Sequence, residues 1–303
     1  MEAPTNRRDD PRALRYVVDH LPPGSRINRQ LLVVNRTPEH RRIDLYPAAA
    51  TLDDQRFVFG EGRAGNELTS WVTLDRTSVE LEPWAETRVR ATVAVPRAAS
   101  AGERYGVIWA SAASTPRPGD SVTQIHRVGV RMYLDVGPGG EPASDFAIGE
   151  LRPARDPGGE PSISAQVTNT GGRAIDLSGQ VILSEGPADS RAGPFAVTKG
   201  TTLAPGQSGQ VSARLPAELP NGPWKVEVAL ESGRIKKTAS GRIEFPEAGR
   251  VGKPASGLSR VLTVWTVGAS LVGLLLVAGL VGLSRRSRQP SRRPPAGRIP
   301  VRH

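Results

Sequence analysis

Apolar and polar residues alternate with a period of two through most of the chain before residue 246. The alternation is clearest at residues 88–95, 127–136 and 224–231. In a β-strand it places one set of side chains against a core and the other set in water. For the middle stretch the predicted core-facing set is Val128, Val130, Met132, Leu134 and Val136. His126 has the same parity, so we expect it to be a partly buried strand residue.

Turn signals separate these short stretches. Examples are Pro-Pro-Gly at 22–24, Gly-Glu-Gly at 60–62 and Asn-Gly at 221–222. Helical periodicity is nearly absent, and the 33 glycines and 27 prolines suit a chain that turns often. We therefore predict an all-β fold with two tandem Ig-like β-sandwiches, followed by one transmembrane α-helix.

A repeat supports the two sandwiches. The Leu-x-Pro turns at residues 81 and 203 are each followed eight residues later by Val-x-Ala, at a constant offset of 122. Val34-Asn35 and Thr168-Asn169 begin a second pair of matching phrases. The order of strands and turns is the same both times, so we expect two related sandwiches.

The predicted membrane helix is the uncharged apolar run from Val261 to Leu283. As a helix it would span roughly 34 Å, enough for a hydrocarbon core of about 30 Å. The positive-inside rule then predicts a single-pass protein of the cell membrane, with its N-terminal domains outside and its C-terminal tail in the cytoplasm. This predicted orientation rests on the arginines directly after the apolar run, namely Arg285, Arg286, Arg288, Arg292 and Arg293.

Export of the β domains requires a signal peptide, and the first residues contain no apolar stretch. We expect the natural chain to begin upstream or to have been trimmed. A tail-anchored protein with a cytoplasmic body is the alternative, which the arginines disfavour. The predicted organisation is a disordered N-terminus at 1–13, a sandwich at 14–136, a linker at 137–145, a second sandwich at 146–246, a spacer at 247–260, the helix at 261–283 and an arginine-rich tail at 284–303.

Charge and composition exclude several classes of function. The last 20 residues hold seven arginines and no acid, which leaves +3 of the net charge of +10 for the rest of the chain. The basic balance therefore does not indicate nucleic acid. Without cysteine, disulfides, thiolate metal sites and cysteine catalysis are excluded. The four histidines lack metal-ligand spacing, and no cofactor motif is present.

The first domain resembles the N-terminal domain of the WxL-interacting surface proteins of Gram-positive bacteria. The phrases that carry the resemblance are YVVDHLPPGS at 16–25, LLVVNRT at 31–37, IDLYPAAAT at 43–51, LEPW at 81–84 and GERYGVIWAS at 102–111. Uncharacterised actinobacterial proteins look similar as well. The resemblance implies a peptidoglycan-binding-type Ig-like domain, a second Ig-like domain that engages a partner protein, and a membrane anchor.

No catalytic constellation is evident. Gly119-Asp120-Ser121 has the letters of a hydrolase nucleophile motif but lacks its strand-to-helix context, and a polar hairpin loop explains it. Trp84, in a turn whose repeat partner is Gly206, is a candidate for stacking on sugar or anchoring a protein, with packing on its own domain as the alternative. Arg36, Arg41 and Arg42 are candidates for binding an anionic polymer, or they form a solvated charged face.

The leading hypothesis is a non-enzymatic, membrane-anchored protein of the cell envelope. Its Ig-like domains would bind a cell-wall polymer, either peptidoglycan or an anionic glycan, or another surface protein. The alternative is a membrane-anchored chaperone or assembly subunit that acts on exported proteins. In the leading hypothesis exposed sheet edges also offer strand addition to a partner.

Overall fold

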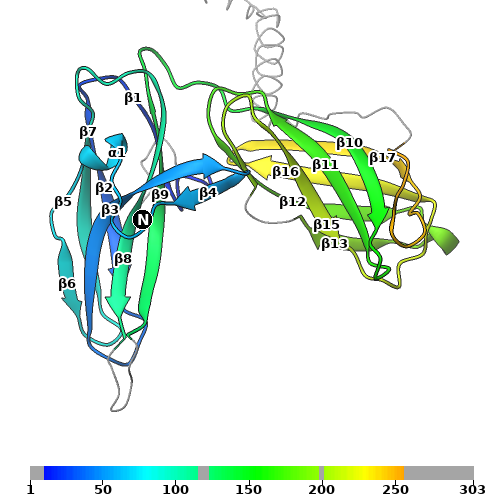
Figure 1. Ribbon diagram of the computed structural model, residues 1–303, viewed down its shortest axis with the longest axis horizontal. Coiled ribbons are helices and arrows are strands. Elements are labelled where there is room, and N and C mark those ends of the chain that lie inside the picture. Colours follow the sequence, from blue (N-terminus) through cyan, green and yellow to red (C-terminus); the bar gives the residue numbers. More distant parts are fainter. Residues whose placement is uncertain (1–9, 115–122, 198–200, 256–303) are drawn as a thin grey trace, which may run out of the picture. The chain divides into compact units, whose positions relative to one another are not determined.

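The computed structural model describes residues 10–114, 123–197 and 201–255. All of them belong to one compact unit, Met1–Thr263. Their secondary structure is almost entirely β, as predicted, and the strands divide into two sandwich-like groups (Figure 1). The single short α-helix of the described residues, α1 (Glu67–Ser70), is capped by Asn66, whose side chain accepts a hydrogen bond from the Thr69 amide.

The first group contains nine strands in two sheets. One sheet has the order β1-β9-β8-β3-β4, with β6 paired to β3, and the other has the order β2-β7-β5. Every pairing is antiparallel except that of β1, which runs parallel to β9. The strands are β1 (Val17–Leu21), β2 (Arg26–Val34), β3 (Arg41–Asp53), β4 (Arg56–Phe59), β5 (Val72–Leu74), β6 (Ser78–Leu81), β7 (Glu86–Ala94), β8 (Gly102–Ala113) and β9 (Ile125–Val136).

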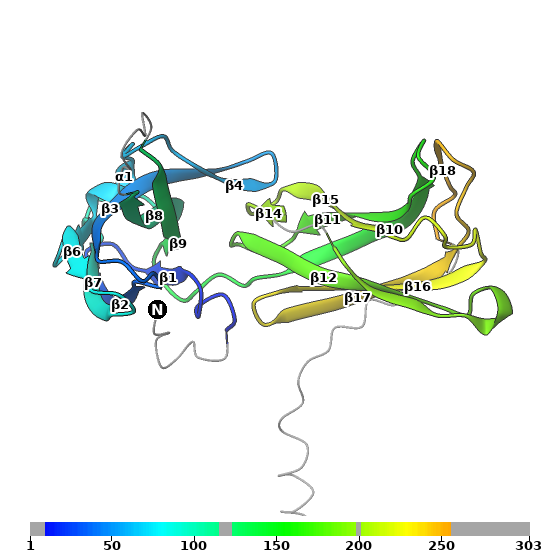
Figure 2. The same cartoon turned by 90° about the horizontal axis from the view of Figure 1, so that it is seen from below.

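The second group also forms two layers, which Figure 2 shows from the side. One layer has the order β15-β11-β10-β18, and the other has the order β13-β12-β16-β17 with β14 paired to β12. The elements are β10 (Phe146–Arg155), β11 (Pro161–Asn169), β12 (Ile175–Ser184), the 3-10 helix η2 (Pro187–Asp189), β13 (Ala192–Ala196), β14 (Thr201–Leu203), β15 (Ser208–Arg214), β16 (Trp224–Ser232), β17 (Ile235–Ile243) and β18 (Arg250–Val251).

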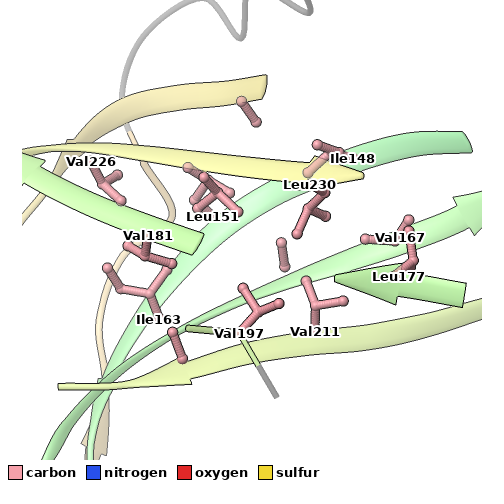
Figure 3. Close-up of a cluster of buried hydrophobic side chains, with 14 of the residues drawn as sticks. Ile148, Leu151, Ile163, Val167, Leu177, Val181, Val197, Val211, Val226 and Leu230 are labelled. Carbon is pink, nitrogen blue, oxygen red and sulfur yellow. The ribbon is translucent and has the colours of Figure 1, made fainter. Parts of the chain in front are cut away.

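The core of the second group lies between its two layers. Ile163 of β11 and Val211 of β15 come from one layer, and Val181 of β12 and Val226 of β16 come from the other (Figure 3). Each of these four side chains is at most 2% exposed. The period-two pattern predicted at 224–231 thus packs as expected, because alternate residues of a strand point to one face.

A buried asparagine holds a corner in each sandwich. Asn35 donates from Nδ2 to the carbonyl of Leu81 at 3.2 Å, and Asn169 donates from Nδ2 to the carbonyl of Leu203 at 3.0 Å. Each side-chain oxygen accepts a backbone N–H two residues further on, from Thr37 in the first case. These matched contacts agree with the repeat expected from the sequence, since each asparagine satisfies the carbonyl of the leucine that begins a Leu-x-Pro phrase.

Candidate functional site

The first half of β9 is uncovered on the face that the sequence predicts to lie in a core. Met132 and Leu134 are each 1% exposed, whereas Val128, with the same parity, is 77% exposed. His126 is exposed too, so the expectation of a partly buried histidine is wrong. The alternation predicts the strand and its faces correctly, but nothing in the described part of the chain covers this half of the face.

The edge of β9 is open over the same residues. On one side β8 pairs with the whole strand, from Ile125 to Val136. On the other side β1 pairs in parallel with residues 132–136 only. Among the described strands, none pairs with residues 125–131 on that side. A free edge of seven residues is about 23 Å long, enough for one more short strand.

A groove of about 760 Å³ lies beside this open edge. Its walls come from β2, β3, β8 and β9, and Figure 1 shows the last three side by side in one sheet. Aliphatic side chains dominate the lining, including Leu31, Val33, Ile43, Ile108, Val128 and Val130. The volume falls within the range of about 300–1,000 Å³ that is usual for binding pockets. The groove combines an apolar floor with free backbone hydrogen-bonding groups.

One end of the groove is basic. Arg36 follows β2, Arg41 begins β3 and His126 lies near the start of β9, and all three line the groove. Arg41 forms an ion pair with Glu39 at 2.6 Å, and its Nη1 donates to the carbonyl of Ala113 at 3.4 Å. Arg36 is exposed. Two of the arginines singled out from the sequence are therefore brought together at one site.

The other two predicted site residues lie elsewhere. Arg42 has a 67% exposed side chain that is 3.5 Å from Asp44 and 3.8 Å from Glu80, and it does not line the groove. Its neighbour Arg41 does, because consecutive strand residues point to opposite faces. Trp84 is 67% exposed in the β6–β7 turn and does not line the groove either.

A separate cluster of buried polar side chains lies near the starts of β8 and β12 and in β9. Tyr105 donates to Glu103, and Tyr133 donates to Asp176, each at 2.8 Å. Burial raises the pKa of Glu103. The hydrogen bonds that Glu103 accepts from Tyr105 and the Ala174 amide, together with the charge of Arg173, offset this rise only in part. Burial also raises the pKa of both tyrosines well above 10.0. Such tyrosines stay protonated and donate hydrogen bonds, so we interpret the cluster as structural.

In the described residues, no group of three or more His, Asp or Glu side chains could hold a metal ion. The Gly119-Asp120-Ser121 triplet lies outside the described residues. The groove residues that sequence reasoning missed, such as Val128 and Val130, had a signal in the alternation, but it indicated core and not an open surface.

Solved structures allow a comparison of the fold. The Pseudomonas aeruginosa CupB2 chaperone is 12% identical, with a match that covers 76% of this chain and 97% of that chain at a TM-score of 0.40. The E. coli chaperone DraB is 14% identical, over 80% and 95% of the two chains, at a TM-score of 0.39. The Salmonella enterica SafA pilin in complex with the SafB chaperone gives 10% identity, 72% and 87% coverage, and a TM-score of 0.41. Sequence identities and TM-scores as low as these do not indicate a shared function.

The comparisons correct the resemblance drawn from the sequence. The solved structures named above are chaperones or a chaperone complex and not WxL-interacting surface proteins. No family model and no curated protein matches the chain. Peptidoglycan binding and a Gram-positive, actinobacterial source therefore have no support, and both predictions are withdrawn.

The predicted membrane localisation is corrected as well. In the part of the chain that the structure describes, no helix is both long and apolar enough to cross a bilayer. The run from Val261 to Leu283 that carried the prediction lies outside the described residues. So do the arginines on which the topology rested, which are Arg285, Arg286, Arg288, Arg292 and Arg293.

Proposed function

We propose that this protein is a non-enzymatic, polypeptide-binding protein that takes an extended segment of another protein into the groove beside β9. The segment adds as a strand to the open edge at residues 125–131. Its alternate side chains enter the apolar groove over Val128 and Val130. The observation that carries the proposal is that, in the part of the chain that the structure describes, one stretch of β9 has neither a strand on its edge nor a cover on its apolar face.

Adding a strand would pair the open edge of β9 and cover its apolar face at the same time. The backbone of the incoming segment pairs with the free N–H and C=O groups of β9, which supplies affinity independent of sequence. Side chains on one face of the segment exchange water for contact with the groove. β1 already occupies the other half of the same edge, where Val17 lies opposite Met132. The edge thus already carries a strand at residues 132–136, and the proposed segment extends the pairing to residues 125–131.

The partner we favour is a chain that still exposes an extended apolar segment, which is the substrate of a chaperone or assembly subunit. A folded partner keeps its alternating apolar residues in its own sheets, whereas an incompletely folded one presents them. The cell-wall polymer of the leading sequence hypothesis fits the groove less well. Sugar recognition generally uses exposed aromatic rings with polar groups, and the groove lining is mainly aliphatic.

Peptide binding to the full-length chain tests the proposal. The probe is a fluorescein-labelled, end-capped peptide of eleven residues in which leucine alternates with threonine, and the comparison peptide has the same composition with its leucines adjacent. Fluorescence anisotropy should show that the alternating peptide binds at least about ten-fold more tightly, because only it places every leucine on one face of a strand. Equal affinities would remove the proposal.

Val128→Asp supplies the matching loss of function. It should weaken the alternating peptide about ten-fold or more, because a carboxylate removes the apolar surface on which the leucines pack and loses water when they cover it. Val251→Asp is the control, since Val251 is 71% exposed on β18 and far from the groove lining. Both variants should unfold at the temperature of the unmodified protein. If the two aspartates weaken binding equally, the groove is not a polypeptide site. If the chain pairs with a second copy that the peptide cannot displace, the groove takes this chain itself and not a segment of another protein.

A further inference from the structure

The groove is electrically asymmetric. Its described lining includes Arg36, Arg41 and His126 and contains no acidic residue. All three lie where β2 ends and β3 and β9 begin. The lining near Leu31 and Val130, further along the strands, is apolar. A strand seated here thus meets positive charge at one end only.

Two arginines differ in how much of their charge is available. Glu39 partly neutralises Arg41, at 2.6 Å, and the Arg41 side chain is 22% exposed. Arg36 is exposed, and within the residues that the structure describes it forms no ion pair. Asn35, 3% exposed, is held by the carbonyl of Glu82 at 3.0 Å and fixes the backbone directly before Arg36. The corner is rigid, while the guanidinium remains able to meet a partner.

We infer that the segment bound in the groove carries an aspartate or glutamate side chain at one end of its apolar alternation, seated against Arg36 and Arg41. This inference rests on the proposed function and specifies its partner class as acidic-flanked, alternating aliphatic segments. The acidic residue sets the register of the strand. Backbone pairing alone tolerates a shift by two residues, which would keep the same face in the groove. A carboxylate that reaches the basic end in one register only removes that ambiguity.

The expected gain in affinity is modest because Arg36 stays near solvent. Exposed ion pairs contribute roughly 0.2–1 kcal/mol, which corresponds to about a 1.4-fold to 5-fold change in Kd. The attraction weakens with salt, whereas the apolar contacts do not. Specificity for an acidic flank is thus separable from the underlying affinity for an alternating segment.

The experiment uses the full-length chain and six end-capped peptides with the alternating leucine–threonine core. Three of them carry glutamate, glutamine or lysine at the N-terminal flank, and the other three carry the same residues at the C-terminal flank. At low salt, one of the two glutamate peptides should bind about three-fold more tightly than its glutamine counterpart. The lysine counterpart should be the weakest. Sodium chloride at about 0.5 M shortens the Debye length to roughly 4 Å and should shrink these differences.

Arg36→Gln should abolish the preference for glutamate over glutamine, and Arg36→Glu should reverse it in favour of lysine. Arg214→Gln is the control, because Arg214 is exposed on β15 in the second sandwich. Equal binding of glutamate, glutamine and lysine peptides, or equal benefit from glutamate at both ends, would overturn the inference and leave the groove proposal standing. If no alternating peptide binds and Val128→Asp changes nothing, the proposed function fails and the inference falls with it.

Discussion

Replacing Asn169 with alanine tests how the second sandwich is held together. The side chain is fully buried, and Nδ2 donates to the carbonyls of Arg173 at 2.8 Å and Leu203 at 3.0 Å. Its oxygen accepts the Gly171 N–H at 3.0 Å. Each hydrogen bond has a net value of roughly 1 kcal/mol, and a buried group left without a partner costs about 1–3 kcal/mol. We expect Asn169→Ala to lower the free energy of unfolding of this sandwich by about 3 kcal/mol.

Hydrogen exchange measured by mass spectrometry suits this test, because two domains need not unfold in one step. Protection of the β11 and β12 backbone should fall by about two orders of magnitude, while that of β7 and β8 should hardly change. Asn28→Ala is the matched control, since Asn28 is exposed and accepts one hydrogen bond from Thr92. If Asn169→Ala costs no more than Asn28→Ala, the buried asparagine is not what satisfies this corner, and the reasoning applied to Asn35 fails with it.

Two further predictions concern stability. Trp84 has φ +63°, in the left-handed region that Gly206 occupies at the matching turn with φ +75°. Because glycine adopts this region without strain, Trp84→Gly should raise the free energy of unfolding, measured by thermal unfolding, by up to about 1 kcal/mol. A clear loss of stability would show that the ring packs on its own domain. Partial burial alone would raise the pKa of Asp145, but the hydrogen bond and charge of Lys237 at 2.6 Å outweigh it, and the pKa lies below its ordinary 3.8. Stability from this pair is present above pH 3.8 and is lost as pH falls through the lower folded value. Asp145→Asn should therefore reduce the loss in the free energy of unfolding on acidification, measured by urea unfolding at a series of pH values. The reduction should be about 0.5 kcal/mol or less, since the carboxylate is 47% exposed, and an unchanged pH dependence would contradict the assignment.

Several features follow from the order of residues alone. The alternation at 127–136 predicts a strand and the side chains on each of its faces, because a strand has a period of two whatever surrounds it. The Leu-x-Pro and asparagine phrases at 34–35 and 168–169 predict matching corners, since turn chemistry is local. The pairing of Trp84 with Gly206 belongs to the same category, and both have positive φ as their shared turn requires.

Long-range features needed the tertiary structure. Val128 and Leu134 have the same parity in one strand, yet one is 77% exposed and the other 1%. The difference depends on whether another layer reaches them, and no local pattern records how far β1 extends along β9. For the same reason the sequence could group Arg36, Arg41 and Arg42 as one cluster but could not show that only the first two line a groove.

The family resemblance was wrong for a related reason. Soft turn and strand phrases are dictated by the β-sandwich itself, so similar phrases arise in proteins whose functions are unrelated. The sequence by itself determined which residues form strands, which faces are apolar and where the turns fall, because these depend on near neighbours in the chain. Only the tertiary structure decided which apolar face stays uncovered and which edge stays open, because pairing between strands far apart in the chain settles both.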